Sequence, residues 1–216
     1  DQEGTDAALR EMIIIGHSQG GILAKFPVMD SGTRFWDNAS EVPFDQIKVS
    51  AETRAMIERS FFYKPLPFVK RVIFIATPHR GSYVAGGWIG KLSGKFIHLP
   101  FQMLDAVKEV VTRNPEAIDM SILKGIPKST GNMDPNSPFI KTFASIPIDP
   151  GVTAHSIVAV KNIDVPKEKW TDGVVKYESA HVDYAASELV VNSGHSTQGE
   201  PETIEEVRRI LLLHIG

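Results

Sequence analysis

The stretch that decides the fold is EMIIIGHSQGGILAK, residues 11–25. A continuous apolar run, typical of a buried strand, leads into Gly-x-Ser-x-Gly at residues 16–20, and a helical pattern starts at Gly20. This context predicts a nucleophile elbow, whose turn is so sharp that the serine is strained. We expect Gly16 and Gly20 to relieve clashes there. The Ser18 hydroxyl then lies at the carboxyl edge of the sheet, where the helix N-terminus favours developing negative charge.

Three further apolar segments resemble strands, and helical patterns separate them. The predicted strands cover residues 12–16, 68–78, 154–162 and 187–193. The predicted helices begin at residues 20, 50, 100 and 201, and a short helix is expected between two turns within residues 134–148. The helix that begins at residue 100 ends before Pro115 and is followed by a short second helix. This alternation predicts an α/β fold with a mostly parallel sheet. We expect a single domain over residues 1–216, with insertions at about 30–67 and 80–150.

Composition excludes several classes of protein. The chain of 216 residues is 42% hydrophobic and 23% charged, which is ordinary for a globular domain. Its net charge of −3 gives no support for nucleic-acid binding, and no apolar run approaches the roughly 18 residues of a membrane span. With no cysteine, disulfides and thiolate chemistry are excluded. No motif indicates a metal or cofactor, and the cellular location stays open, with export and membrane association among the options.

A serine needs a histidine base to act as a nucleophile at neutral pH. His195 follows the fourth predicted strand in a glycine-flanked loop, which opens on the same sheet edge as Ser18. His181 is the remaining alternative. The other five histidines are less well placed: His17 adjoins Ser18, His79 and His155 adjoin strands, His98 lies in an insertion and His214 ends the last helix.

An acid must orient that histidine. Asp172 lies in an Asp-Gly turn after the third predicted strand and before the fourth, and Asp164 and Asp183 are its rivals. The chain order Ser18, Asp172, His195 is the order found in α/β-hydrolases. We therefore predict these three residues as nucleophile, acid and base.

Four segments resemble a bacterial lipase/esterase-like group within the α/β-hydrolase superfamily. They are GHSQGG (16–21), VIFIATPHRGS (72–82), TDGVVKYESAH (171–181) and ELVVNSGHSTQGEPETIEEVRRILLLHI (188–215). The resemblance covers nearly the whole chain, and many lipases carry a similar Asp-Gly segment about one helix before their catalytic histidine. It implies the same roles for Ser18, Asp172 and His195.

The resemblance also implies an oxyanion hole and a larger fold. The backbone N–H of Gln19 is expected to be one oxyanion donor. The second donor normally comes from the loop after the third strand of the full fold. Because the elbow follows the fifth strand in that fold, the strands here correspond to five to eight. We therefore expect the N-terminal strands to be missing and the chain to be the C-terminal portion of a longer hydrolase.

The two insertions lie where α/β-hydrolases build caps or lids. They contain nine aromatic residues: Phe35, Trp36, Phe44, Phe61, Phe62, Tyr83, Trp88, Phe96 and Phe101. These side chains could line a site for an acyl chain, or they could pack the cap onto the core. His17, His79 and Trp88 are the candidate substrate-binding residues, and the cap is where contact with a lipid interface is expected.

The sequence therefore favours a serine ester hydrolase, lipase- or carboxylesterase-like, that acts on an apolar acyl ester or lipid. An acyltransferase or a thioesterase with the same three residues is the first alternative. The alternative from another class is a non-catalytic fragment that binds lipid or a partner. We expect no nucleic-acid partner, no metal and no cofactor.

Overall fold

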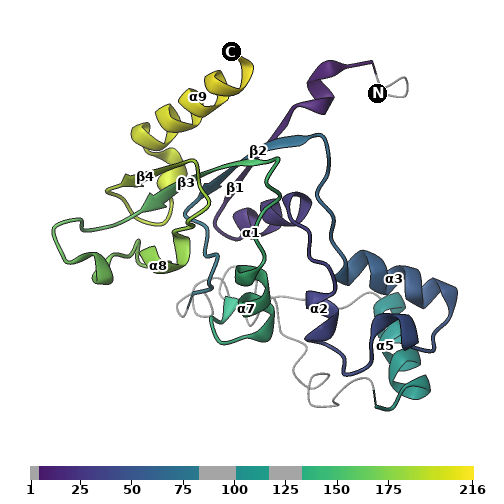
Figure 1. Ribbon diagram of the computed structural model, residues 1–216. Coiled ribbons are helices and arrows are strands. Elements are labelled where there is room, and N and C mark those ends of the chain that lie inside the picture. The colour runs from purple at the N-terminus through teal and green to yellow at the C-terminus, as the bar shows by residue number, and fades with distance from the viewer. Residues whose placement is uncertain (1–4, 83–100, 117–132) are drawn as a thin grey trace.

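A four-stranded, all-parallel sheet forms the centre of the computed structural model, which describes residues 5–82, 101–116 and 133–216 (Figure 1). The strands are β1 (Met12–His17), β2 (Val69–Ile75), β3 (Thr153–Ala159) and β4 (Ser187–Val191). They lie in the order β1-β2-β3-β4, so each crossover leads to the next neighbour. The prediction of an α/β fold with a parallel sheet is confirmed.

Helices connect and flank the strands. The α-helices are α1 (Gln19–Lys25), α2 (Arg34–Asp37), α3 (Ala51–Phe61), α5 (Phe101–Arg113), α7 (Pro138–Ser145), α8 (Tyr177–Ala180) and α9 (Pro201–Ile215). The 3-10 helices are η1 (Ala7–Arg10), η2 (Phe26–Val28), η3 (Phe44–Gln46), η5 (Lys167–Lys169) and η6 (Thr197–Gly199).

The sheet is apolar on both faces, as a parallel sheet covered by helices requires. Alternate residues of β2 show this: Val72 and Phe74 pack in the cluster that contains Ala24 of α1, whereas Ile73 packs in the cluster that contains Ile210 of α9. Figure 1 shows α1 and α9 on opposite sides of the sheet. The central strands β2 and β3 therefore bury both sets of their side chains, which explains why they read as continuous apolar runs.

The element boundaries differ from the predictions at a few positions. β2 ends at Ile75, three residues before the predicted end, because Ala76 adopts a φ of 46° and turns the chain away. α1 begins at Gln19 and ends at Lys25, and Pro27 lies in η2. The short helix predicted after Pro115 lies outside the described residues. The four-residue helices α2 and α8 carry no periodic signal that a sequence pattern could detect.

The two insertions pack against each other beside the sheet. Glu109 of α5 accepts hydrogen bonds from the backbone N–H and the hydroxyl of Ser50, both at 2.8 Å, and one from the Thr53 hydroxyl. The hydrogen bond from Thr53 has the largest effect, and together with those from Ser50 it holds the pKa of Glu109 below its usual value. Ser50 also caps α3, because its Oγ accepts from the Thr53 N–H at 3.2 Å. One carboxylate therefore joins the start of α3 to α5.

Aromatic side chains fill the interior of this helical region. Phe35 and Trp36 are buried, and Trp36 packs edge-on against Phe44 and Phe61 with ring centroids 5.3 and 5.6 Å apart. Phe62 stacks at a tilt on Phe44. The described aromatic residues of the insertions thus pack against one another. The remaining candidates, Tyr83, Trp88, Phe96 and the side chain of Phe101, lie outside the described part of the chain.

Candidate active site

Ser18 occupies a sharp turn between β1 and α1. Its backbone φ of 54° and ψ of −126° lie in a region that residues other than glycine rarely adopt. The backbone N–H of Ser18 donates to the Ile75 carbonyl at 2.8 Å, which ties the turn to the end of β2. The turn therefore presents Ser18 at the carboxyl edge of the sheet.

Two glycines make this turn possible, and one of them differs from the prediction. A Cβ on Gly16 would lie 2.6 Å from the Gly20 carbonyl oxygen, so Gly16 relieves a clash as expected. A Cβ on Gly20 would meet nothing within 4 Å, so the expected role for Gly20 is wrong. The second crowded position is Gly21, where a Cβ would lie 1.8 Å from the Thr77 hydroxyl oxygen. The repeated glycine in GHSQGG carried this signal in the sequence.

Ser18, His195 and Asp172 lie in one hydrogen-bonded line. Nε2 of His195 is 2.7 Å from Oγ of Ser18, and Nδ1 of the same ring is 2.7 Å from Oδ2 of Asp172. Residues separated by 177 positions in the chain thus meet at one edge of the sheet. This arrangement allows the serine to give its proton to Nε2 while the carboxylate stabilises the imidazolium that results.

Asp172 is fixed from the other side as well. Its carboxylate is 1% exposed, and Oδ1 accepts from the backbone N–H groups of Val174 and Val175, both at 2.7 Å. These bonds compensate the cost of burying the charge and leave Oδ2 directed at His195. The Asp-Gly turn supplies this geometry, because Gly173 adopts a φ of 94° between the acceptor and its donors.

The loop that carries His195 is anchored to β1. Nε2 of His17 donates to the His195 carbonyl oxygen at 2.8 Å, and the two rings lie 5.2 Å apart. The ring of His17, a candidate for substrate binding, thus reaches the backbone of the histidine loop. Gln19, the residue after Ser18, begins α1. The backbone N–H of Gln19 has no acceptor among the described residues. That N–H is available to a ligand beside Ser18.

The rival residues lie in other contacts. His181 is 2.6 Å from a Glu188 oxygen through Nδ1 and 3.0 Å from Asp183 through Nε2. The hydroxyl of Tyr177 donates to Glu188 at 2.6 Å and completes this cluster. Asp164 is exposed. His181 and Asp183 therefore pair with each other and not with Ser18.

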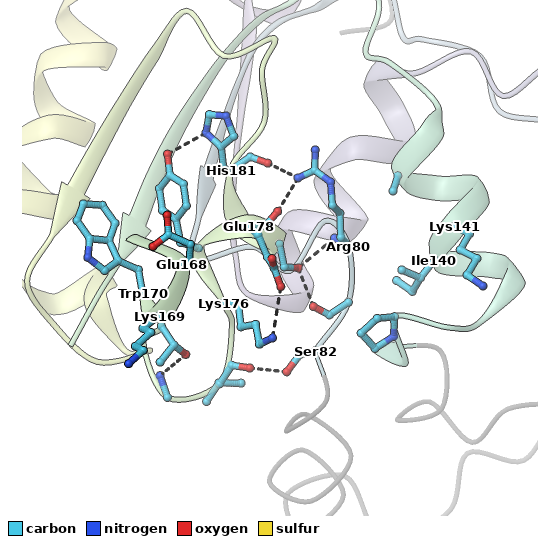
Figure 2. Close-up of a pocket in the computed structure, with 18 residues that line it drawn as sticks. Arg80, Ser82, Ile140, Lys141, Glu168, Lys169, Trp170, Lys176, Glu178 and His181 are labelled. Carbon is cyan, nitrogen blue, oxygen red and sulfur yellow. Dashed lines mark hydrogen bonds and ion pairs between the residues drawn. The ribbon is translucent and has the colours of Figure 1, made fainter. Parts of the chain in front are cut away.

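A cavity of about 990 Å³ lies between α7 and the segment that carries Asp172 (Figure 2). Trp170, Val174 and Tyr177 line one wall, and Ile140 of α7 lines another. Arg80 closes one end, because its Nη1 donates to the carbonyl oxygens of residues 178 and 181 at 2.7 and 2.6 Å. Ser18, Asp172 and His195 are not among its lining residues. The cavity therefore borders the turn that holds the acid and not the serine itself.

Of the two other predicted substrate-binding residues, His79 is described and makes no contact with Ser18, His195 or Asp172 that would add it to this line. His79 is 2% exposed and packs edge-on against Phe74, and burial, together with the charges of Lys25 and Arg80, lowers its pKa to about 3. It borders a smaller cavity that lies apart from Ser18. Trp88 lies outside the described residues.

The described residues contain neither a cluster of metal ligands nor a helix that could cross a membrane. No group of three or more histidine and acidic side chains there is arranged to hold a metal ion. None of the described helices combines the length and the apolar character that crossing a bilayer requires.

Comparison with known proteins gives similarities at the level of structure. No protein-family model matches the sequence, and no curated protein is significantly similar to it. The structure is similar to the mature form of a Bacillus licheniformis lipase, at 15% identity over 94% of this chain and 66% of the lipase, with a TM-score of 0.45. It is also similar to the Staphylococcus hyicus lipase, at 10% identity over 95% of this chain and 69% of that lipase, with a TM-score of 0.44. The chain thus spans about two thirds of the length of these lipases.

Proposed function

We propose that this chain carries the reaction centre of a serine ester hydrolase, with Ser18 as nucleophile, His195 as general base and Asp172 as its orienting acid. The observation that supports the proposal is the pair of 2.7 Å contacts that join the three side chains. The strained backbone of Ser18 adds to the support. Such strain costs free energy, and strained residues cluster at functional sites; a serine strained between a strand and a helix is typical of a nucleophile elbow.

In the acylation step, Oγ of Ser18 attacks the carbonyl carbon of the ester while its proton moves to Nε2 of His195. The carbonyl π electrons move to the oxygen, and the N–H of Gln19 at the start of α1 stabilises the oxyanion. The tetrahedral intermediate then collapses. The alcohol leaves with the proton from Nε2, and the acyl group stays on Ser18.

In the deacylation step, a water molecule takes the place of the alcohol. It gives a proton to Nε2 of His195 and attacks the acyl carbon, and collapse releases the carboxylic acid and returns the proton to Oγ of Ser18. Asp172 stabilises the imidazolium in both steps and holds Nδ1 protonated, so that Nε2 is the basic nitrogen.

We infer an apolar acyl ester as the substrate class, and we assign the residue 30–67 and 80–150 insertions as its cap. The aromatic and aliphatic walls of the cavity beside Asp172 support this inference, since apolar walls with a few polar groups are typical of small-molecule sites.

Hydrolysis of p-nitrophenyl esters of increasing acyl length tests the function. Ser18→Ala should abolish turnover, whereas Ser60→Ala, which removes an α3 hydroxyl bonded to the Met56 carbonyl, should leave it unchanged. A hydrolase, a thioesterase and an acyltransferase all form the same acyl-enzyme, so the three side chains do not distinguish them. A parallel panel of thioesters and acceptor alcohols does, because the three enzymes differ in leaving group or in acceptor. Equal turnover in Ser18→Ala and the native chain would refute the assignment.

A further inference from the structure

A second cavity, of about 200 Å³, lies apart from Ser18 and has a polar wall that the proposed reaction does not use. The residues that border it include Lys25, His79, Arg80, Ser145, Asp183 and Tyr184. We call this space the Lys25 cavity. It is bordered by the last residue of α1, the segment after β2, the end of α7 and residues 182–184.

Lys25 is unusual because it is 1% exposed and has no carboxylate partner among the described residues. Its Nζ donates to the Phe143 carbonyl oxygen at 2.8 Å and lies 4.5 Å from the centre of the Phe143 ring and 5.9 Å from that of Tyr184. A protonated amine buried without a counter-ion is costly. The buried Lys25 amine therefore borders the cavity without a carboxylate paired to it in the described part of the chain.

Two further polar side chains at this cavity lack partners within the described residues. Both ring nitrogens of His79 and the hydroxyl of Tyr184 are buried and make no hydrogen bond there. Most buried polar atoms in folded proteins are hydrogen-bonded, so three such atoms around one cavity are unusual. The groups supply more donors than acceptors, since the lysine and tyrosine donate and a neutral imidazole donates once.

The charges at the rim reinforce the positive character of the cavity. Arg80 contributes a guanidinium whose Nη1 donates to backbone carbonyl oxygens. Asp183 is the acid at the rim, but its side chain is 86% exposed and lies 3.0 Å from His181. An exposed, paired carboxylate is screened by water and opposes the buried cation only weakly.

We propose that the Lys25 cavity binds a small oxyanion, either inorganic phosphate or a short-chain carboxylate, through Lys25, His79 and Tyr184. The anion supplies the missing counter-ion and accepts from the two side chains that have no partner. A volume of about 200 Å³ admits such an anion and excludes a long acyl chain. This site is independent of Ser18 and of the proposed reaction.

Binding should depend on pH in a defined direction. Burial, and secondarily the charge of Arg80, lowers the pKa of Lys25 to about 7, and burial lowers that of His79 to about 3. Burial also raises the pKa of Tyr184, so the tyrosine stays protonated as a donor. Arg80 and Asp183 are the other charged groups that border the cavity. The lowered pKa of Lys25 brings the change of its charge close to neutral pH. Anion binding should be tighter at pH 6 than at pH 8.5.

Thermal unfolding of the 216-residue chain tests the proposal. The probes are sodium phosphate, sodium acetate and neutral acetamide, each titrated against sodium chloride at matched ionic strength. An anion that binds only the folded state raises the unfolding temperature in a saturable way. We expect this rise with phosphate, acetate or both, and none with acetamide. Phosphate alone identifies a tetrahedral anion, and acetate alone a carboxylate. The pH comparison uses acetate, whose own charge is constant from pH 6 to 8.5.

Variants separate a specific site from general salt effects. Lys25→Met and Tyr184→Phe should each lower the affinity for the anion by at least about tenfold. Tyr184→Phe should fold as well as the native chain without anion, because it removes a hydroxyl that has no partner there. Lys64→Met, which removes an exposed lysine paired with Asp30, is the matched control. No saturable rise, an equal rise with acetamide, or an unchanged rise in both cavity variants would overturn the proposal.

Discussion

The glycines around Ser18 face very different surroundings, and this difference predicts unequal effects of substitution. Gly21→Ala places a methyl group against Cβ, Cγ2 and Oγ1 of Thr77, so rotation of the threonine does not relieve the clash. Overpacking of this kind costs about 1–3 kcal/mol. Gly20→Ala enters open space in a helix and should change the free energy of unfolding by less than about 1 kcal/mol. Urea unfolding of the two variants measures the difference, and equal losses would contradict the packing described.

A second prediction at the residue scale concerns the acid. Asp172→Asn keeps an oxygen for the N–H groups of Val174 and Val175 but no longer favours a proton on Nδ1 of His195. We expect turnover to fall by roughly 10³–10⁴-fold while the unfolding midpoint changes little. Ester hydrolysis and urea unfolding measure the two effects.

Asp164→Asn and Asp183→Asn are the matched controls for that prediction. Each removes one negative charge, from an exposed residue and from the partner of His181, respectively. Both should leave turnover within about twofold of the native value. If Asp164→Asn or Asp183→Asn were the variant that lost turnover, the assignment of Asp172 would be wrong.

At the scale of elements, a buried histidine joins three strands. Nε2 of His155 on β3 accepts from Nη1 of Arg71 on β2 at 2.5 Å, and its Nδ1 bonds Ser187 of β4 at 2.7 Å. Burial and the adjacent Arg71 guanidinium lower the pKa of His155 to about 4. The neutral ring is therefore the form that holds these strands together.

This network predicts that acid weakens the sheet. The unfolded chain takes up a proton on His155 near pH 6.5, whereas the folded chain resists it down to about pH 4. The stabilisation is complete above pH 6.5 and is lost as pH falls from there toward 4. Between pH 7 and pH 5, the free energy of unfolding should fall less in the His155→Gln variant than in the native chain. Urea unfolding at both values measures it, and identical losses would contradict the network.

The elements could be predicted from the sequence because strand and helix periods are local signals. The apolar runs gave all four strands, and Ser50 and Pro201 marked the starts of α3 and α9. Contacts across the chain could not be predicted in this way. A lysine in a helix suggests a solvated side chain, yet Lys25 is buried because α7 and residues 182–184 cover it. The bond from His17 to the His195 carbonyl likewise depends on loop packing that no spacing encodes.

At the scale of the whole molecule, β1 is an edge strand. Within the described residues it pairs with β2 alone, and Ile15 beside that edge is 45% exposed. Leu213 and Ile215 of α9 are 57% and 78% exposed, and His214 of the same helix bonds the carbonyl oxygen of Glu11 at 2.7 Å, next to the start of β1. An apolar, unpaired strand edge is a site of association between chains.

We therefore expect the 216-residue chain to self-associate. Ile15→Lys should shift it toward the monomer, because a charge beside an open edge opposes strand pairing. Leu23→Lys, at a leucine on α1 that is 64% exposed, is the control and should leave the association unchanged. Sedimentation velocity over a concentration series measures both. A native chain that is monomeric at all concentrations, or an equal effect of the two lysines, would contradict this expectation.

Covalent labelling of Ser18 tests the central claim most directly. A fluorophosphonate reacts with a serine only when a neighbouring base activates its hydroxyl, so it reports the Ser18–His195–Asp172 line without requiring efficient turnover. Mass spectrometry should find one adduct, on the peptide that contains Ser18, absent in Ser18→Ala and formed more slowly in Asp172→Asn. An unlabelled native chain, or equal labelling of Ser18→Ala, would contradict the account.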